Sequence, residues 1–248
     1  MSSRLVIRTR AYSEDLRRAA EAIEQAAWSE LGYLNYTRAH YENYAEILRK
    51  YDDYQLCLVD CETDYPVAVF NSVPLSSVGF DDLPQEGWDW VVETGAKPKG
   101  PYTMLGGLAM SIPAVHRAKG YGRRMLRAMR ELAENKGLRG VLAAVRPSSK
   151  ARHPWVGIDD YVTWTDGRGR AFDPWLRSHL SSGGKLVGPC RRSMVVEEPI
   201  AFWETWAKQE YPESGSYAID GALVPLEVDL KKGIGRYAEP NIWVTYAC

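Results

Sequence analysis

The segment Ile112–Leu126, IPAVHRAKGYGRRML, holds the residues of this chain that are best suited to chemistry, because they can bind an anion. Within it, Arg117-x-x-Gly120-x-Gly122 follows an apolar stretch and precedes apolar residues at helical spacing. Glycine lets the backbone turn tightly and approach a ligand, since it has no Cβ. The amides of such a loop and of the first helical turn converge where the helix dipole also favours negative charge. This spacing therefore predicts a pyrophosphate-binding site.

Positive charge surrounds the same loop, although the whole chain has a net charge of only −1. An ordinary strand–helix turn with a solvated basic helix face would share some of these features, but the combination favours phosphate binding. The chain has no Gly-x-x-x-x-Gly-Lys-Ser/Thr motif for a nucleoside triphosphate, and no Gly-x-Gly-x-x-Gly near its start for a dinucleotide. The basic residues before the first carboxylate, Glu131, are His116, Arg117, Lys119, Arg123, Arg124, Arg127 and Arg130.

Strand, loop and helix together resemble the acyl-CoA-binding motif of the GNAT superfamily of N-acetyltransferases, which reads Gln/Arg-x-x-Gly-x-Gly/Ala after a strand with a hydrophobic end. Arg117, Gly120 and Gly122 occupy the three signature positions, and the resemblance covers about 102–196. It implies that the loop amides hold the CoA pyrophosphate and that the strand end binds the pantetheine arm. The implied CoA-binding residues are Met110, Ser111, Ile112, Arg117, Ala118, Lys119, Gly120, Tyr121, Gly122 and Arg123.

A histidine takes the place of a tyrosine that this family often uses in catalysis. In the family, a Tyr four residues before a Gly, on the helix after the next strand, protonates the departing CoA thiolate. This chain has His179 four residues before Gly183. Imidazole titrates near neutral pH, so His179 can donate a proton to a thiolate or accept one from an amine. The alternative is a helix-face histidine with one structural hydrogen bond.

Two carboxylates offer a second candidate for proton transfer. Glu227 and Asp229 lie two apart in the strand-like run ALVPLEVDL, so their side chains share one face. If that face borders the site, either could accept the ammonium proton. An edge strand with a solvated acidic face fits the pattern equally well.

The acceptor site is expected beside the long polar segment 151–170, which exceeds ordinary loop lengths and is too aromatic for simple disorder. We expect this segment to form a lid or wall. Arg192, in a nearby strand candidate, could bind a substrate carboxylate. The candidate substrate-binding residues are Trp155, Tyr161, Trp164 and Arg192.

Composition predicts a single, well-cored domain over 1–248, with 45% hydrophobic and 25% charged residues. The resemblance implies that this domain is GNAT-like. No apolar run is long enough to cross a membrane, and no signal peptide is recognisable, so we expect a cytoplasmic protein. The four cysteines are irregularly spaced and predict no metal site. The net charge gives no general nucleic-acid footprint. The resemblance implies a small-molecule amine as the partner, and we expect a monomer or homodimer.

The expected fold class is α/β (α+β). The resemblance implies a mixed, mostly antiparallel sheet of six to eight strands, flanked by helices and splayed at the acyl-CoA site. The order β-α-α-β-β-β-α-β-α-β-β is the layout that the resemblance implies. The apolar patterns fit it, with a loop-rich stretch over 74–101, and add one helix and two strands after it. The predicted helices are one after Ser13, 37–50, one from about 121, 174–182 and one from Pro199; the strands are 5–8, 54–60, 66–73, 104–112, 140–146, 185–188, 193–196, 222–230 and 241–246.

The leading functional interpretation is an acetyl-CoA-dependent N-acetyltransferase that acts on a small amine by direct transfer in a ternary complex, without a metal. Thioester and amine are reactive once they are aligned. A second interpretation is a decarboxylase or S-acetyltransferase of the polyketide-loading type, because Asp173-Pro174-x-Leu176-x-x-His179 also resembles GNAT-like decarboxylases. A non-catalytic regulatory module that binds CoA or DNA fits the residues less well.

Overall fold

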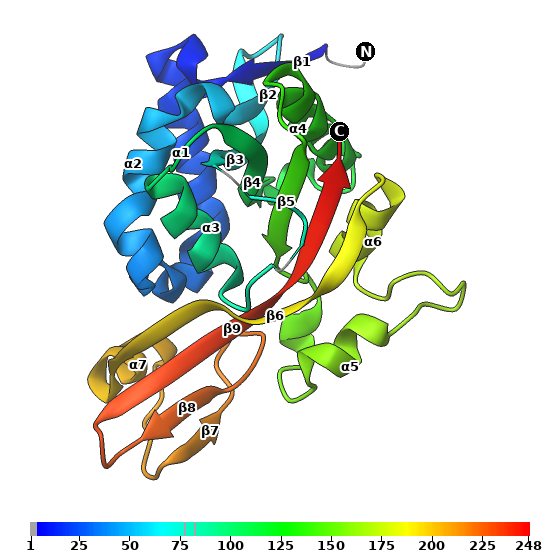
Figure 1. The fold of residues 1–248 in the computed structure, drawn as a ribbon. Coiled ribbons are helices and arrows are strands. Elements are labelled where there is room, and N and C mark those ends of the chain that lie inside the picture. The colour runs from blue at the N-terminus through cyan, green and yellow to red at the C-terminus, as the bar shows by residue number, and fades with distance from the viewer. Residues whose placement is uncertain (1–3, 77, 82) are drawn as a thin grey trace.

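A nine-stranded mixed sheet with helices on both faces forms the centre of the molecule (Figure 1). The structure is a computed structural model, and it describes residues 4–76, 78–81 and 83–248. The strand order is β1-β2-β3-β4-β5-β9-β8-β7, with β6 also paired to β9. Within the described residues β4 and β5 pair in parallel, and the other strand pairs are antiparallel. The GNAT-like class is confirmed, with more strands than the resemblance implied.

The element bounds match most of the predicted patterns. The strands are β1 (Leu5–Thr9), β2 (Leu56–Asp60), β3 (Tyr65–Ser76), β4 (Tyr102–Ser111), β5 (Gly140–Val145), β6 (Lys185–Pro199), β7 (Gly215–Tyr217), β8 (Leu226–Asp229) and β9 (Ile234–Ala247). The α-helices are α1 (Glu14–Trp28), α2 (Ala45–Lys50), α3 (Gly87–Ala96), α4 (Tyr121–Asn135), α5 (Ile158–Thr163), α6 (Pro174–Ser181) and α7 (Ile200–Ala207). Three shorter helical segments matter for the site: η2 (Ser29–Tyr36), η3 (His40–Tyr44) and η5 (Ala114–His116).

The structure departs from the predicted elements in three places. Helix α3 lies inside the stretch that we expected to be loop-rich, because Trp88, Val91 and Val92 bury one helical face there. The two strands expected at 185–188 and 193–196 are one strand, β6, whose pairing with β9 is interrupted by register shifts. The short strand β7 was not expected.

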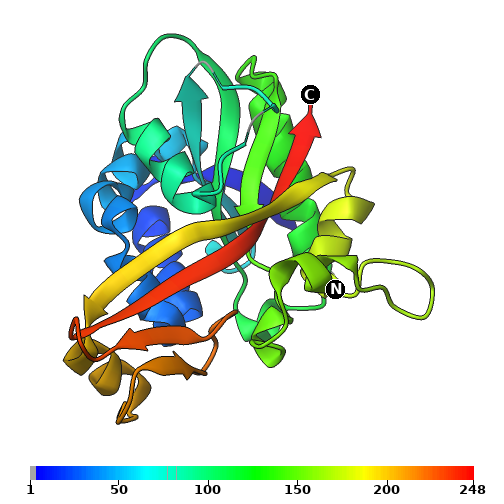
Figure 2. The same ribbon diagram turned by 60° about the horizontal axis from the view of Figure 1, so that its bottom comes forward.

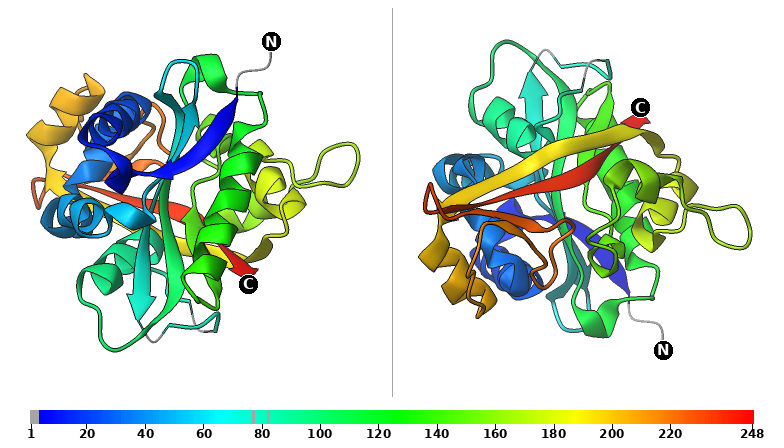
Figure 3. Two further views of the ribbon diagram at one scale, coloured as in Figure 1. Left: turned by 90° about the horizontal axis from the view of Figure 1, so that it is seen from above. Right: turned by 90° about the horizontal axis from the view of Figure 1, so that it is seen from below.

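The sheet separates two helical layers with different cores. On one face, α4 and α6 pack on apolar side chains of β4, β5 and β9, such as Leu105, Val141 and Val244. On the other face, α1, α2 and α3 cover β3 and β4, where Val73, Met104 and Leu108 join the buried cluster. The views in Figure 3 show α1 and α4 on opposite sides of the sheet.

Strand β9 holds the two halves of the sheet together. One end of β9 pairs with β5, and the other end pairs with β8, while β6 follows the opposite edge over most of its length. Figure 2 shows β6 and β9 as a long ribbon that crosses the molecule and ends beside α7, β7 and β8. No helix in the described part of the chain is both long and apolar enough to cross a membrane.

Candidate active site

The strands β4 and β5 separate directly beside the predicted CoA-binding loop. Their parallel pairing runs from Leu105–Val141 to Gly107–Ala143 and then stops, while β4 stays paired to β3 as far as Ser111. A bulge accompanies the separation, because Asn71 faces Ala109 and Ser72 faces Gly107 across the β3–β4 pair. The sheet therefore opens between the ends of β4 and β5, as the resemblance implied.

The loop before α4 has the backbone conformation of an anion cradle. Gly120, the N-cap, has φ 78°, and no side chain caps the helix, so the first-turn amides have no side-chain acceptor. Ala118 also has positive φ, 61°, which is costly for a residue with a Cβ. The Arg117 side chain braces the loop by donating from Nε to the Ile112 carbonyl at 3.2 Å. A Cβ at Gly120 would meet no atom within 4 Å, so the space beside this residue is open.

Only part of the basic block remains available to a ligand. Arg124 donates to the carbonyl of Leu5, and Arg130 lies partly buried beside Tyr246. Arg123 and Arg127 are exposed one turn apart, and neither has an ion pair or hydrogen bond to another described residue. These two side chains form the free basic face of α4.

His179 lies on α6, one turn after a tryptophan that touches the cradle helix. The Trp175 and His179 rings are 4.5 Å apart, and a Cβ on Gly122 would come within 3.2 Å of Trp175. The histidine is 3% exposed, and its Nδ1 lies 2.8 Å from the Tyr246 hydroxyl. Its Nε2 is buried without a partner among the described residues. The predicted catalytic histidine is thus linked to the first turn of α4, through Trp175.

Burial changes the acid–base behaviour that we expected for His179. Desolvation lowers the pKa of His179 to about 4, although the charge of Asp173 opposes this shift. The imidazole is therefore neutral at physiological pH, so it does not titrate near neutrality, and an imidazolium acid is excluded at rest. A neutral imidazole can still donate or accept a hydrogen bond at Nε2, depending on its tautomer.

Two tryptophans attach the α1–α3 layer to the separated arm of β4. The Trp88 indole donates to the carbonyl of Leu108 at 2.7 Å, at the bulge. The Trp28 indole donates to the hydroxyl of Ser111 at 2.9 Å. The predicted CoA residue Ser111 is thus buried and bound by Trp28, while Met110 and Ile112 remain half-buried.

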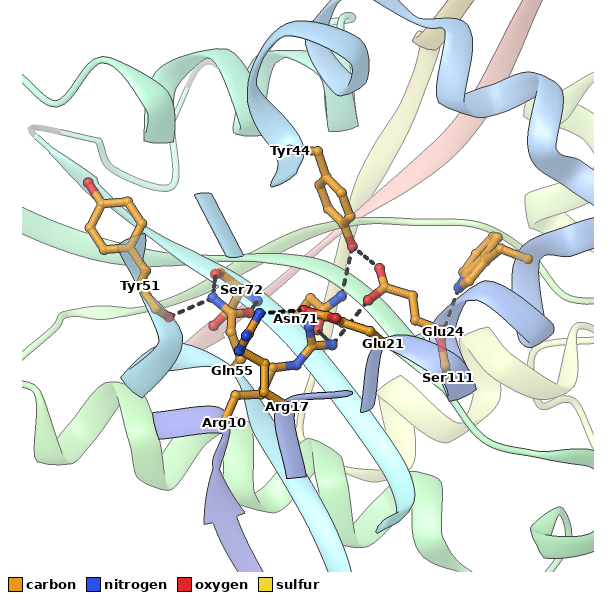
Figure 4. A network of polar contacts seen from close by, with 11 residues as sticks. Arg10, Arg17, Glu21, Glu24, Tyr44, Tyr51, Gln55, Asn71, Ser72 and Ser111 are labelled. Atoms are coloured by element: carbon orange, nitrogen blue, oxygen red, sulfur yellow. Dashed lines mark hydrogen bonds and ion pairs between the residues drawn. The ribbon is translucent and has the colours of Figure 1, made fainter. Parts of the chain in front are cut away.

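A closed ring of hydrogen bonds fixes α1 and η3 over the same strands (Figure 4). Arg10 Nη2 donates to Glu24 at 3.0 Å and to Asn71 at 2.7 Å, and Asn71 donates to the Tyr44 hydroxyl at 2.7 Å. Tyr44 closes the ring on Glu24. Burial, followed by the Glu24 charge, raises the pKa of Tyr44, so its hydroxyl stays protonated. These residues were not found from the sequence, because their polar partners are far apart along the chain.

The aromatic segment 151–170 folds into a small cluster around α5. Tyr161 is buried and donates to the Asp173 carboxylate at 3.0 Å, and Trp164 packs on Tyr161 and Phe172. Asp173 also caps α6 by accepting from the amides at 175 and 176. Trp155 is 64% exposed. Tyr161 and Trp164 therefore hold this cluster together, and Trp155 is the exposed one of the three.

The predicted acidic pair and the predicted arginine lie on other parts of the surface. Glu227 is exposed on β8 and accepts from Ser216, while Asp229 caps the following turn. Arg192 is exposed and pairs with Glu86 at 2.5 Å. Strand β8 lies at the far end of the β6–β9 ribbon in Figure 1, so the structure does not bring Glu227 and Asp229 together with His179.

A different arginine stands at the end of β5. Arg146 donates from Nε to the Glu239 carboxylate at 3.0 Å and from Nη2 to the Gly221 carbonyl. Its position directly after a buried strand is the feature of the sequence that could have singled out Arg146.

The larger of two described surface cavities, about 430 Å³, lies elsewhere, and its lining residues are Tyr36, Arg38, Tyr41, Val195, Glu197 and Glu198. The described residues contain no group of three or more His, Cys, Asp or Glu placed to hold a metal ion.

Comparisons with known proteins give one clear sequence relative. No protein-family model matches the chain. Arginine N-acetyltransferase avaD of Aspergillus versicolor is 32% identical over 220 residues, which cover 78% of this chain and 76% of that protein.

Two solved structures share the fold at low sequence identity. The loading GNATL domain of CurA from Lyngbya majuscula is similar with a TM-score of 0.62 and 18% identity, over 98% of both chains. The GphF GNAT-like decarboxylase in complex with isobutyryl-CoA has a TM-score of 0.57 and 17% identity, again over 98% of both chains. These two likenesses concern the fold.

Proposed function

This chain belongs to the GNAT superfamily and is an acyltransferase, and from that premise we propose that it transfers an acetyl group from acetyl-CoA to the amine of a small molecule. The transfer is direct, within a complex that holds donor and acceptor together. Because the sequence relative is an arginine N-acetyltransferase, arginine is the first acceptor to test.

The observation that carries this proposal is the uncapped start of α4 beside the opening between β4 and β5. The cradle offers backbone amides, positive φ at Gly120 and open space, and Arg123 and Arg127 add free positive charge. Anions bind at such helix starts because the amides and the helix dipole act together. The donor's pyrophosphate fits the cradle, and its arm fits the half-buried β4 end at Met110 and Ile112.

The chemistry needs one bond to form and one to break. The amine nitrogen attacks the thioester carbonyl and the C–N bond forms. The C–S bond breaks, the sulfur leaves as thiolate, and the nitrogen loses its proton to solvent. Aligning the two reactants supplies much of the rate. In our proposal His179 stays neutral and hydrogen-bonds the thiolate through Nε2, while the Tyr246 hydroxyl donates to Nδ1.

The test is acyl transfer itself. The protein is incubated with acetyl-CoA and a panel of amines that includes L-arginine, while free thiol and acylated product are measured by absorbance and mass. We expect thiol release that requires an amine and yields an equal amount of acetylated amine. Thiol release without any acylated product, across the whole panel, would contradict the proposal.

Decarboxylation is the second candidate, because the unpartnered Nε2 of His179 is linked to the cradle helix through Trp175. The same nitrogen could assist the loss of CO2 from malonyl-CoA. Incubation with malonyl-CoA and no amine separates the two functions. Conversion to acetyl-CoA, abolished by His179→Ala, would favour the decarboxylase.

A further inference from the structure

One nitrogen of Arg146, at the end of β5, is free to bind a ligand. Nε donates to both oxygens of Glu239 at 3.0 and 3.1 Å, and Nη2 donates to the carbonyl of Gly221. Nη1 has no acceptor among the described residues and is not buried. The side chain is 17% exposed, whereas Glu239 is fully buried. The guanidinium therefore reaches solvent through Nη1.

The surrounding network holds this guanidinium in one orientation. Glu239 also accepts from the Tyr237 hydroxyl at 2.8 Å, and Tyr237 accepts from the amide of Leu223 at 2.9 Å. The Leu223 carbonyl in turn accepts from the buried amine of Lys150 at 2.7 Å. A side chain that is already ordered loses little conformational entropy when it binds a ligand. Arg146 is thus prepared for binding.

Arg146 lies on the face of the sheet opposite the anion cradle. On β5, Leu142 and Ala144 belong to the same buried cluster as Trp88 of α3, and Arg146 follows two residues after Ala144. Trp88 also holds Leu108 on the diverging arm of β4. Helix α4 packs on the other face. An acyl chain that enters the opening from the cradle side therefore emerges on the side of Arg146.

We propose that Nη1 of Arg146 binds a carboxylate of the acceptor, so that the acceptor is an amino acid or another amine that carries a carboxylate. This inference rests on the proposed function. A guanidinium–carboxylate hydrogen bond is charge-assisted, and the guanidinium stays charged at every physiological pH. Arg192, which the sequence suggested for this role, is exposed and pairs with Glu86.

The test compares two acceptors that differ only in the carboxylate. L-arginine and L-argininamide share the α-amine and the side chain, but the amide carries no negative charge. We expect the wild type to prefer L-arginine by at least about tenfold in kcat/KM. In Arg146→Gln/Glu239→Gln, which removes both charges of the buried pair, the preference should fall close to one, mainly through a higher KM for L-arginine. Arg38→Gln/Glu42→Gln removes an exposed ion pair and should keep the preference.

Binding measurements keep the inference separate from the proposed function. Calorimetric titration of the CoA-loaded protein with each acceptor gives the same comparison without turnover. Discrimination in binding but no acylation of either amine would support Arg146 and contradict the transferase. Equal use of both amines by the wild type would overturn the role of Arg146 and leave the transferase intact. If the double variant does not fold, Arg146→Lys and the wild-type comparison decide the question in the same way.

Discussion

At the scale of single residues, the site that we propose rests on two backbone positions and one imidazole. Gly120 and Ala118 turn the chain so that its amides are left free, and His179 lies behind them in a dry environment. The sequence pattern predicted site roles for Gly120 and His179, and these roles stay predictions. It did not reveal that burial would hold the imidazole neutral, because the partners Trp175 and Tyr246 come from two elements.

Substitution of Gly120 by Glu should remove CoA binding while the protein stays folded. The new side chain would place a negative charge at the start of α4, beside the amides that we propose hold the pyrophosphate. Gly169→Glu is the matched control, because Gly169 also has positive φ and open space around it. Both variants should lose roughly 1–2 kcal/mol of stability from backbone strain. Unchanged calorimetric CoA affinity in folded Gly120→Glu would contradict the cradle.

Replacing His179 by Ala should lower kcat about a hundredfold and leave acetyl-CoA affinity nearly unchanged, since the group acts on the leaving sulfur. Because the pKa of His179 is lowered to about 4, titration of this histidine should not change the rate near pH 6.5. The pH–rate profiles of the wild type and the variant should therefore have the same shape in that range. Steady-state kinetics between about pH 5.5 and 8 measure both features. His153→Ala is the control. Near-normal turnover of folded His179→Ala would make this histidine structural.

At the scale of elements, α4 presents its charged side chains to solvent, whereas α3 turns one toward the sheet. Helix α4 leaves Arg123 and Arg127 exposed without partners among the described residues, whereas α3 holds the partly buried Asp89 against β6. Periodicity predicted α4 because its apolar residues recur over a long helix. It missed α3, a short helix among glycines and prolines, since its stability comes from packing against β3 and β6.

The free basic face of α4 should bind the 3′-phosphate of CoA. Arg123→Ala with Arg127→Ala is expected to weaken CoA more than dephospho-CoA, by tenfold or more at low salt, because the attraction is charge-assisted and screened by ions. Lys231→Ala with Lys232→Ala removes the same charge elsewhere and should have no effect. Equal losses for both ligands, measured by calorimetry, would show that the two arginines are solvated surface.

Asp89 should make the protein less stable as pH rises. Burial raises the pKa of Asp89 to about 7, against roughly 4 in the unfolded chain. The folded state therefore keeps a proton that the unfolded chain releases, so stability falls as pH increases from 4 through 7. Asn cannot ionise and can still accept from the Val195 amide. In urea unfolding, the free energy of unfolding of Asp89→Asn, relative to that of the wild type, should rise by about 2 kcal/mol between pH 5 and pH 8. A pH-independent difference would contradict this assignment.

At the scale of the whole molecule, β9 joins the acyl-CoA half of the sheet to the part that carries α7, β7 and β8. The resemblance predicted the central architecture because its motif fixes one strand, one loop and one helix. It could not predict the β7–β8 extension or the position of Glu227 and Asp229, because strand patterns do not specify which partner a strand selects.

We propose that the chain unfolds as one unit, since every strand belongs to a single sheet. Differential scanning calorimetry should show one transition, and CoA should move that transition as a whole to higher temperature. Two transitions, of which CoA shifts only one, would show that the β7–β8–α7 part is an independent domain.

The late position of β9 also has a consequence for biosynthesis. Strand β5 is complete at residue 145, but its partner β9 begins at residue 234. At about 5–20 residues per second, a ribosome needs roughly 5–20 s to make the intervening chain. During that interval the edge of β5 is unpaired, and an unpaired apolar strand edge is prone to aggregation. The nascent protein therefore passes through a period in which this apolar edge is open to aggregation or to chaperone binding.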